Sequence, residues 1–116
     1  MAKILIADDS QFMRKILKDI LYGAGYTDTI ECVDGKECMA KYVSEKPDLV
    51  LLDIIMPEMD GMEVLKKIGH EVKVVVISAV GQEKMIGEAK DLGSLDYIVK
   101  PFDNNQVLEV VKKVLG

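Results

Sequence analysis

Residues 48–57 contain a short aliphatic run, Val50, Leu51 and Leu52, which ends at the acid Asp53. The run is apolar at every step and does not alternate with polar residues, so both faces of the segment should be buried. This pattern is typical of an inner strand in a parallel sheet, which helices cover on both faces. Asp53 would then lie at the carboxyl end of the strand, where open α/β sheets bind their ligands.

Short apolar runs and amphipathic segments alternate along all 116 residues. Strands are expected at Lys3–Ala7, Thr27–Val33, 48–52, Val72–Ile77 and Leu95–Val99. Helices are expected at Phe12–Leu21, Lys36–Ser44, a short segment after Gly61, Gln82–Leu92 and Val107–Leu115, where apolar residues recur at helical spacing. Five strand–helix repeats predict an α/β fold, a doubly wound five-stranded parallel sheet with helices on both faces.

Several polar and glycine residues should mark where the helices begin and end. Ser10 is suited to cap the first helix, and Asp103 or Asn104 the last one. Gly23 and Gly25 should stop the first helix, because glycine readily adopts the backbone conformation of a helix terminus. These signals leave no linker between the elements, and we expect a single domain over residues 1–116.

Composition excludes several classes of function. The chain is 49% hydrophobic with a formal net charge of −5, and no basic run stands out, so neither nucleic acid nor a membrane is expected as a partner. It has no signal-peptide pattern and no apolar stretch of about 18 residues, so we expect a cytoplasmic protein. Cys32 and Cys38 should be reduced core residues, and His70 alone cannot complete a zinc site with them.

Polar side chains follow four of the five predicted strands. Asp8 and Asp9 follow the first strand and Asp53 the third, while Ser78 and Lys100 follow the last two. Because the carboxyl ends of parallel strands share one edge of the sheet, these residues should meet in space.

Each of these residues also has a simpler structural interpretation. The pair Asp8 and Asp9 could merely favour a helix N-terminus, through the helix dipole. Ser78 could be a turn residue, and Lys100 a solvated surface lysine. Their coincidence at four strand ends favours the functional interpretation.

The expected cluster has a definite chemistry. Three carboxylates held together repel one another and need a cation, and oxygen ligands with room for water suit Mg²⁺ or Mn²⁺. The Lys100 ammonium and the Ser78 hydroxyl could bind a phosphoryl group during its transfer. Asp53 stands alone on the central strand and is therefore the best nucleophile, forming an acyl phosphate.

Over its whole length the sequence resembles the response-regulator receiver family, whose fold is flavodoxin-like. The motifs that carry the resemblance are Asp8-Asp9, Asp53–Pro57 with Asp60-Gly61, Ser78-Ala79, and Lys100-Pro101-Phe102. Residues 10–14 and 78–82 are most similar to the stand-alone chemotaxis members of that family.

The resemblance implies roles for the acids at the strand ends. Asp53 would take a phosphoryl group from the phosphohistidine of a histidine kinase. Asp9, Asp53 and the backbone carbonyl of Ile55 would bind Mg²⁺ directly, with Asp8 assisting through water. The implied activity is self-phosphorylation and self-dephosphorylation of a signalling protein, with no separate substrate turned over.

The resemblance also implies a cradle and a switch. Lys100, joined to Pro101 by a cis peptide bond, would contact the phosphoryl oxygens together with Ser78 and the backbone N–H of Ala79. Tyr97 would swing inward when Ser78 is drawn to the phosphoryl group, although it could also be an ordinary half-buried strand residue.

Two apolar residues flank the predicted site, at positions that tune hydrolysis of the acyl phosphate in the family. These are Ile55 and Val80. Apolar side chains position water poorly, so we expect slow self-dephosphorylation.

The expected partners are those of a monomeric chemotaxis regulator: a CheA-like histidine kinase, a flagellar-motor switch protein or an archaeal adaptor, and a phosphatase. They would meet a switch surface formed by residues 82–92, 95–99 and the last helix. Alternatives are a receiver domain cut from a longer, DNA-binding regulator, and an unphosphorylated binding module. An Mg²⁺-dependent phosphatase with an aspartate nucleophile is disfavoured, because such enzymes need a second acid two residues after the nucleophile, and this chain has Ile55 there.

Overall fold

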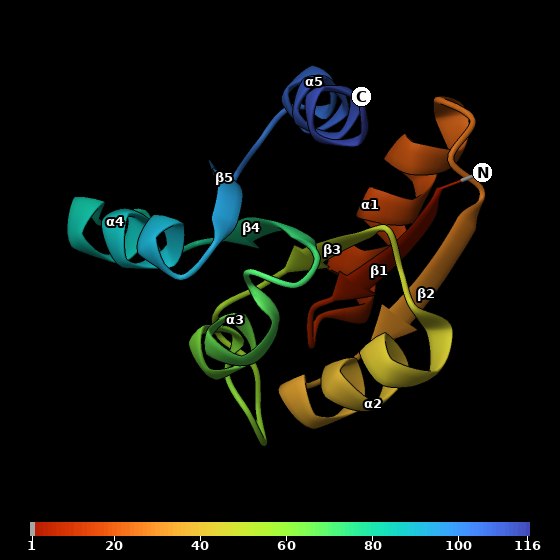
Figure 1. Cartoon of the computed structure of the whole chain (residues 1–116). Coiled ribbons are helices and arrows are strands. Elements are labelled where there is room, and N and C mark those ends of the chain that lie inside the picture. Colours follow the sequence, from red (N-terminus) through yellow and green to blue (C-terminus); the bar gives the residue numbers. More distant parts are fainter. Residues whose placement is uncertain (1) are drawn as a thin grey trace.

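The computed structural model describes residues 2–116, in which five strands alternate with five helices. The strands are β1 (Lys3–Ala7), β2 (Asp28–Cys32), β3 (Leu49–Leu52), β4 (Lys73–Ser78) and β5 (Ser94–Val99). The helices are α1 (Gln11–Gly23), α2 (Gly35–Glu45), α3 (Gly61–Ile68), α4 (Glu83–Asp91) and α5 (Asn104–Leu115). All strand pairs are parallel, in the order β2-β1-β3-β4-β5, which confirms the predicted doubly wound fold (Figure 1).

The predicted ends of α1 and α5 agree with the structure. Ser10 caps α1 by accepting a hydrogen bond from the Met13 N–H, and Asp103 caps α5 in the same way. The prediction that Gly23 and Gly25 stop α1 is confirmed, because the helix ends at Gly23 and Ala24 is its C-cap. Gly25 follows the cap with a φ of 92°, which suits glycine.

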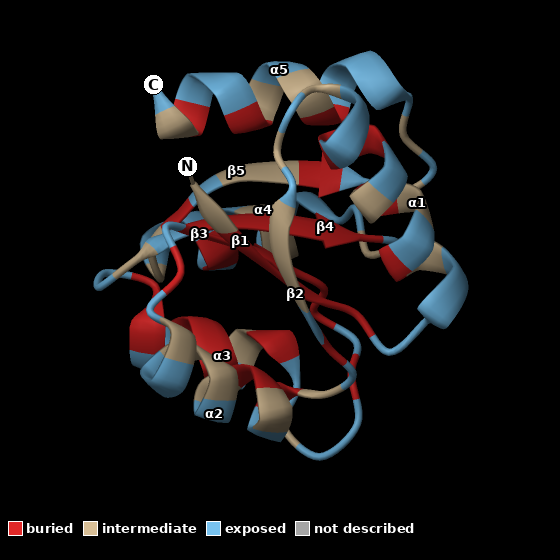
Figure 2. Ribbon diagram, turned by 90° about the vertical axis from the view of Figure 1, so that its right-hand side faces the viewer, coloured by how far each residue is buried: buried red, intermediate tan, exposed pale blue. Residues whose placement is uncertain are grey.

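The sheet separates two hydrophobic layers. One contains α2, α3 and α4, with Cys38, Val64 and Ala89 in its core, and the other contains α1 and α5, with Leu17 and Val111. Figure 2 shows the buried strands running between these layers. The buried thiols of Cys32 and Cys38 are both free.

The central strand β3 is buried along its whole length. It pairs with β1 on one side and β4 on the other, and none of its four side chains is more than 1% exposed. Burying each such aliphatic side chain contributes roughly 1.5–3 kcal/mol. Asp53 therefore follows a strand that is paired on both sides and covered on both faces.

Gly61 brings helix α3 directly against the end of β3. A Cβ atom at this position would lie 2.1 Å from the carbonyl oxygen of Asp53, so no other residue fits without a shift. The Gly61 N–H donates to the carbonyl of Ile54 at 2.7 Å. This close approach fixes the loop that leaves the strand at Asp53.

Among the helices within residues 2–116, none is long and apolar enough to cross a membrane.

Candidate functional site

The predicted acids converge at the carboxyl edge of the sheet. One carboxylate oxygen from each of Asp8, Asp9 and Asp53 lies within 4.8 Å of the others. Backbone pairing sets this placement: the Asp53 N–H donates to the Ala7 carbonyl, and the Asp8 N–H donates to that of Cys32. Asp8 and Asp53 thus prolong two strand pairs, and Asp9 follows Asp8 directly in the chain.

The three acids differ in burial. Asp8 is 2% exposed and Asp53 is 7% exposed, whereas Asp9 is exposed. The cluster therefore combines two buried acids with one that is exposed to solvent, and Asp9 forms its outer rim.

Lys100 bridges the two buried acids. Its Nζ atom lies 2.7 Å from Asp8 Oδ2 and 2.9 Å from Asp53 Oδ2. The residue follows β5, and its backbone N–H donates to the carbonyl of Ser78, which extends the pairing of β4 with β5. The Lys100–Pro101 peptide bond is cis. The simpler interpretation of Lys100 as a solvated surface lysine is wrong, since its side chain is 16% exposed.

Charge in the cluster is unbalanced. Burial raises the pKa of Asp8 above its ordinary value, even though Lys100 and the Ser10 N–H act in the opposite direction. Burial alone would lower the pKa of Lys100, but its two carboxylate partners raise it. Three carboxylates face one ammonium at neutral pH, so the site favours a further cation. All three donors are oxygen atoms, which suits a hard divalent ion.

Ser78 and Tyr97 meet at the loop that follows β4. Ser78 is fully buried, and its Oγ accepts a hydrogen bond from the Val80 N–H at 3.2 Å. The half-buried Tyr97, on the adjacent strand β5, donates its hydroxyl hydrogen to the carbonyl of Val80. Burial raises the pKa of Tyr97 above its ordinary value, so the phenol stays protonated and can donate. Ala79, between Ser78 and Val80, is exposed.

Ile55 lies at the solvent side of the cluster. Its side chain is 60% exposed, while its N–H donates to Asp53 Oδ1 at 3.2 Å. This bond turns the loop back over the acid. The assignment of the Ile55 carbonyl as a metal ligand stays a prediction.

Arg14 is a neighbour of the site that the sequence interpretation missed. Its Nη1 donates to the backbone carbonyl of Asp8 at 2.6 Å, and the residue is buried. The spacing of Arg14 along the chain could have indicated that it is buried, because Arg14, Leu17 and Leu21 fall on one face of α1 and are all buried.

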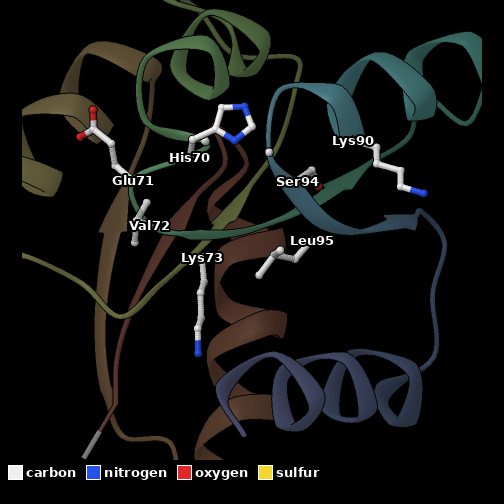
Figure 3. Close-up of a pocket in the computed structure, with 9 residues that line it drawn as sticks. His70, Glu71, Val72, Lys73, Lys90, Ser94 and Leu95 are labelled. Atoms are coloured by element: carbon white, nitrogen blue, oxygen red, sulfur yellow. The ribbon is translucent and has the colours of Figure 1, made fainter.

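A surface hollow of about 690 Å³ lies at the other edge of the sheet, away from the acids. It is lined by residues at the amino ends of β4 and β5, including Lys73 and Ser94 (Figure 3). Lys73 and Lys90 extend in different directions there, so their charges do not converge on one ligand. The chemistry is therefore located at the acidic cluster rather than in this hollow.

Comparison with known proteins identifies the family. Residues 4–112 match the response regulator receiver domain. The chain belongs to the response-regulator receiver family. The chemotaxis protein CheY of Thermotoga maritima is 46% identical over 115 residues, covering 97% of this chain and 96% of that protein. CheY of Bacillus subtilis is 43% identical over 117 residues, covering 98% of each.

A solved structure has the same architecture. It is the CheX–CheY–BeF3–Mg complex from Borrelia burgdorferi, with a TM-score of 0.94 and 36% identity, covering 99% of this chain and 90% of that one. The fold is therefore CheY-like and flavodoxin-like, with its acids at the strand ends. The chain is a receiver-type signalling protein similar to chemotaxis regulators, rather than an enzyme that turns over a separate substrate.

Proposed function

We propose that this chain is a phosphorylation-gated chemotaxis switch in which Asp53 accepts a phosphoryl group from a CheA-like histidine kinase. The convergence of Asp8, Asp9 and Asp53 with Lys100 at one sheet edge carries this proposal. A nucleophilic carboxylate, neighbouring acids and a fixed ammonium are what phosphoryl transfer to an acid requires.

The transfer conserves charge and bonds in a simple way. A carboxylate oxygen of Asp53 attacks the phosphorus of the phosphohistidine. The new P–O bond forms as the P–N bond breaks. The electron pair of the P–N bond stays on the imidazole nitrogen of the kinase. Because Asp53 is only 7% exposed, a donor would have to approach it from the solvent side of the cluster, where Asp9 is exposed.

Several residues around Asp53 would bind the phosphoryl group and its metal. Asp9, Asp53 and the Ile55 carbonyl would hold Mg²⁺, with Asp8 assisting through water, and Mn²⁺ suits the same oxygen donors. A bound ion would supply positive charge to stabilise the phosphoryl oxygens. Lys100 would donate to these oxygens, together with the Ser78 hydroxyl and the Ala79 N–H.

The switch would run through the loop after β4. Attraction of Ser78 to the phosphoryl group would move this loop, and with it the Val80 carbonyl that accepts from Tyr97. Tyr97 would then change its position on β5, between α4 and α5. This surface would meet the flagellar-motor switch protein or an adaptor.

The names of the relatives support a chemotaxis role for the partners. The kinase would dock over Asp53, and a phosphatase would reach the same edge of the sheet. We place the protein in the cytoplasm, as a monomer and a single domain over residues 1–116.

The test is incubation with acetyl phosphate and Mg²⁺, followed by intact-mass measurement. We expect a mass increase of one phosphoryl group that disappears in Asp53→Asn and when a chelator is added. Asp96→Asn is the matched control, because Asp96 lies on β5 and pairs with Lys113 outside the site. No adduct on the wild-type chain, or an adduct that persists in Asp53→Asn, would overturn the proposal.

A further inference from the structure

Arg14 joins helix α1 to the β1–α1 loop and to strand β2 through one buried guanidinium. Its Nη1 donates to the backbone carbonyl of Asp8 at 2.6 Å, and its Nε donates to Glu31 Oε1 at 2.9 Å. Glu31 lies on β2 and is also contacted by Lys18 at 3.3 Å. The residue is 9% exposed, so it occupies one fixed position between the β1–α1 loop and β2.

The carbonyl that Arg14 binds has a special place in the chain. It belongs to the planar peptide unit that joins Asp8 to Asp9. The remaining groups of Asp8 are held elsewhere: its N–H by Cys32, and its two carboxylate oxygens by Ser10 and Lys100. Holding the carbonyl therefore also fixes the direction in which the chain enters Asp9.

Asp9 depends on this backbone contact more than Asp8 does. Asp8 is buried and its carboxylate is held by two donors, whereas Asp9 is exposed at the rim. An exposed aspartate has only two side-chain torsions between its carboxylate and the backbone, so the peptide plane largely determines where the carboxylate can reach.

We propose that Arg14 is a positioning residue for the cation site. By holding the Asp8–Asp9 peptide plane, it directs the Asp9 carboxylate toward Asp8 and Asp53. Glu31 supports this role because it holds the other side of the guanidinium. The inference rests on the proposed function, since it concerns the residues that would bind Mg²⁺.

Simple electrostatics makes the opposite prediction, which allows a sharp test. Arg14 carries a positive charge next to the cluster, on the backbone carbonyl of Asp8, and removing that charge makes the surroundings of the site more negative. Coulomb attraction alone would then strengthen the binding of Mg²⁺. Loss of positioning weakens it instead, so the sign of the change distinguishes the two effects.

The experiment is a calorimetric titration of the full chain with MgCl2, with Arg14→Met as the main variant. We expect its Kd for Mg²⁺ to rise about tenfold, in the range found when partners that orient metal ligands are removed. Lys15→Met is the matched control: it removes a cation from the same helix, but Lys15 pairs with Asp19 on the exposed face, and its Kd should be unchanged.

Two further variants keep the test decisive if Arg14→Met folds poorly. Arg14→Lys keeps the charge but cannot supply two donors in the geometry of a guanidinium, so its Kd should also rise. Glu31→Gln leaves the contact with Asp8 in place but weakens its support, and a smaller rise is expected. Thermal melts establish that each variant is folded at the titration temperature.

A second measurement separates positioning from contact with the phosphoryl group. Phosphorylation of Arg14→Met by acetyl phosphate should need more Mg²⁺ for half-maximal rate, but reach the wild-type rate at saturation. An unchanged or lower Kd in the folded Arg14 variants, with normal binding by wild type, overturns the role of Arg14 alone. Wild-type protein that neither binds Mg²⁺ nor forms an adduct overturns the proposed function as well.

Discussion

Replacing Lys100 with Met tests how far the fold depends on one ammonium between two buried carboxylates. The substitution keeps most of the aliphatic volume but removes the charge and its contacts with Asp8 and Asp53. Those contacts measure 2.7 and 2.9 Å, and the side chains of Lys100, Asp8 and Asp53 are 16%, 3% and 9% exposed. The variant therefore leaves two acids buried beside each other without their cation.

The burial of these side chains sets the magnitude. Removing one partner of a buried ion pair costs about 3–5 kcal/mol, because the other charge stays buried and unpaired. Since the site opens to solvent at Asp9, we take the lower value, about 3 kcal/mol at pH 7 without metal. For a domain of this size, this corresponds to a fall in Tm of about 12 °C.

Metal should restore much of the loss, because a divalent cation can neutralise the same carboxylates. Mg²⁺ at 100 times its Kd for the variant returns about 2.7 kcal/mol. The gain in wild type should be smaller, since Lys100 already neutralises part of the acidic charge. The stability difference between the two proteins should therefore narrow in Mg²⁺.

Urea denaturation in chelator and in Mg²⁺ measures both effects, provided that the m-values agree. Lys113→Met is the matched control: its ion pair with Asp96 is also 2.9 Å long, but the Lys113 side chain is 67% exposed. That substitution should cost between 0 and about 1 kcal/mol, in either buffer. A loss in Lys100→Met no larger than the control's, or a difference that Mg²⁺ does not narrow, would refute the reasoning.

Two other predictions concern the rim of the site and the support of Arg14. In Ile55→Asn and Val80→Glu, the aspartyl phosphate should decay faster than in wild type, because a polar side chain can orient the attacking water. Intact-mass measurement over time follows this decay, and an unchanged decay rate would contradict the prediction. Burial would raise the pKa of Glu31, but the hydrogen bonds from Arg14 and Lys18 lower it below its ordinary value. The ionised Glu31 therefore stabilises the fold above pH 4.5, and this stabilisation is lost as the pH falls through the lower pKa of the folded state. Glu31→Gln should therefore be less stable than wild type in urea at pH 7, by about 1 kcal/mol or less, and the difference should vanish in acid; a constant difference would contradict the assignment.

The architecture could be predicted because its signals are local. The unbroken aliphatic character of β3 indicates burial on both faces, and the spacing of apolar residues in α1 indicates a helix. The glycines that follow α1 also indicated its end, because glycine readily adopts the left-handed conformation that follows a helix. α1 ends at Gly23, and Gly25 turns left-handed just after the cap.

The site was predictable for a topological reason. Parallel strands bring their carboxyl ends to one edge, so the acids after β1 and β3 and the lysine after β5 were expected on the same edge of the sheet. Strand topology alone does not predict which side-chain atoms make contact. That Lys100 bonds Asp8 as well as Asp53 depends on side-chain reach across two neighbouring strands.

Local patterns in the sequence are therefore enough to predict the elements, their alternation and the set of residues at the acidic edge. How that edge is held follows from contacts that form only in the folded chain. Arg14 is a helix residue whose partners, the Asp8 carbonyl and Glu31, lie on other elements. Such contacts depend on strand order, register and packing of α1 against the sheet, which arise from the whole chain. Periodicity says that a residue faces the core, but the three-dimensional arrangement says what it meets there.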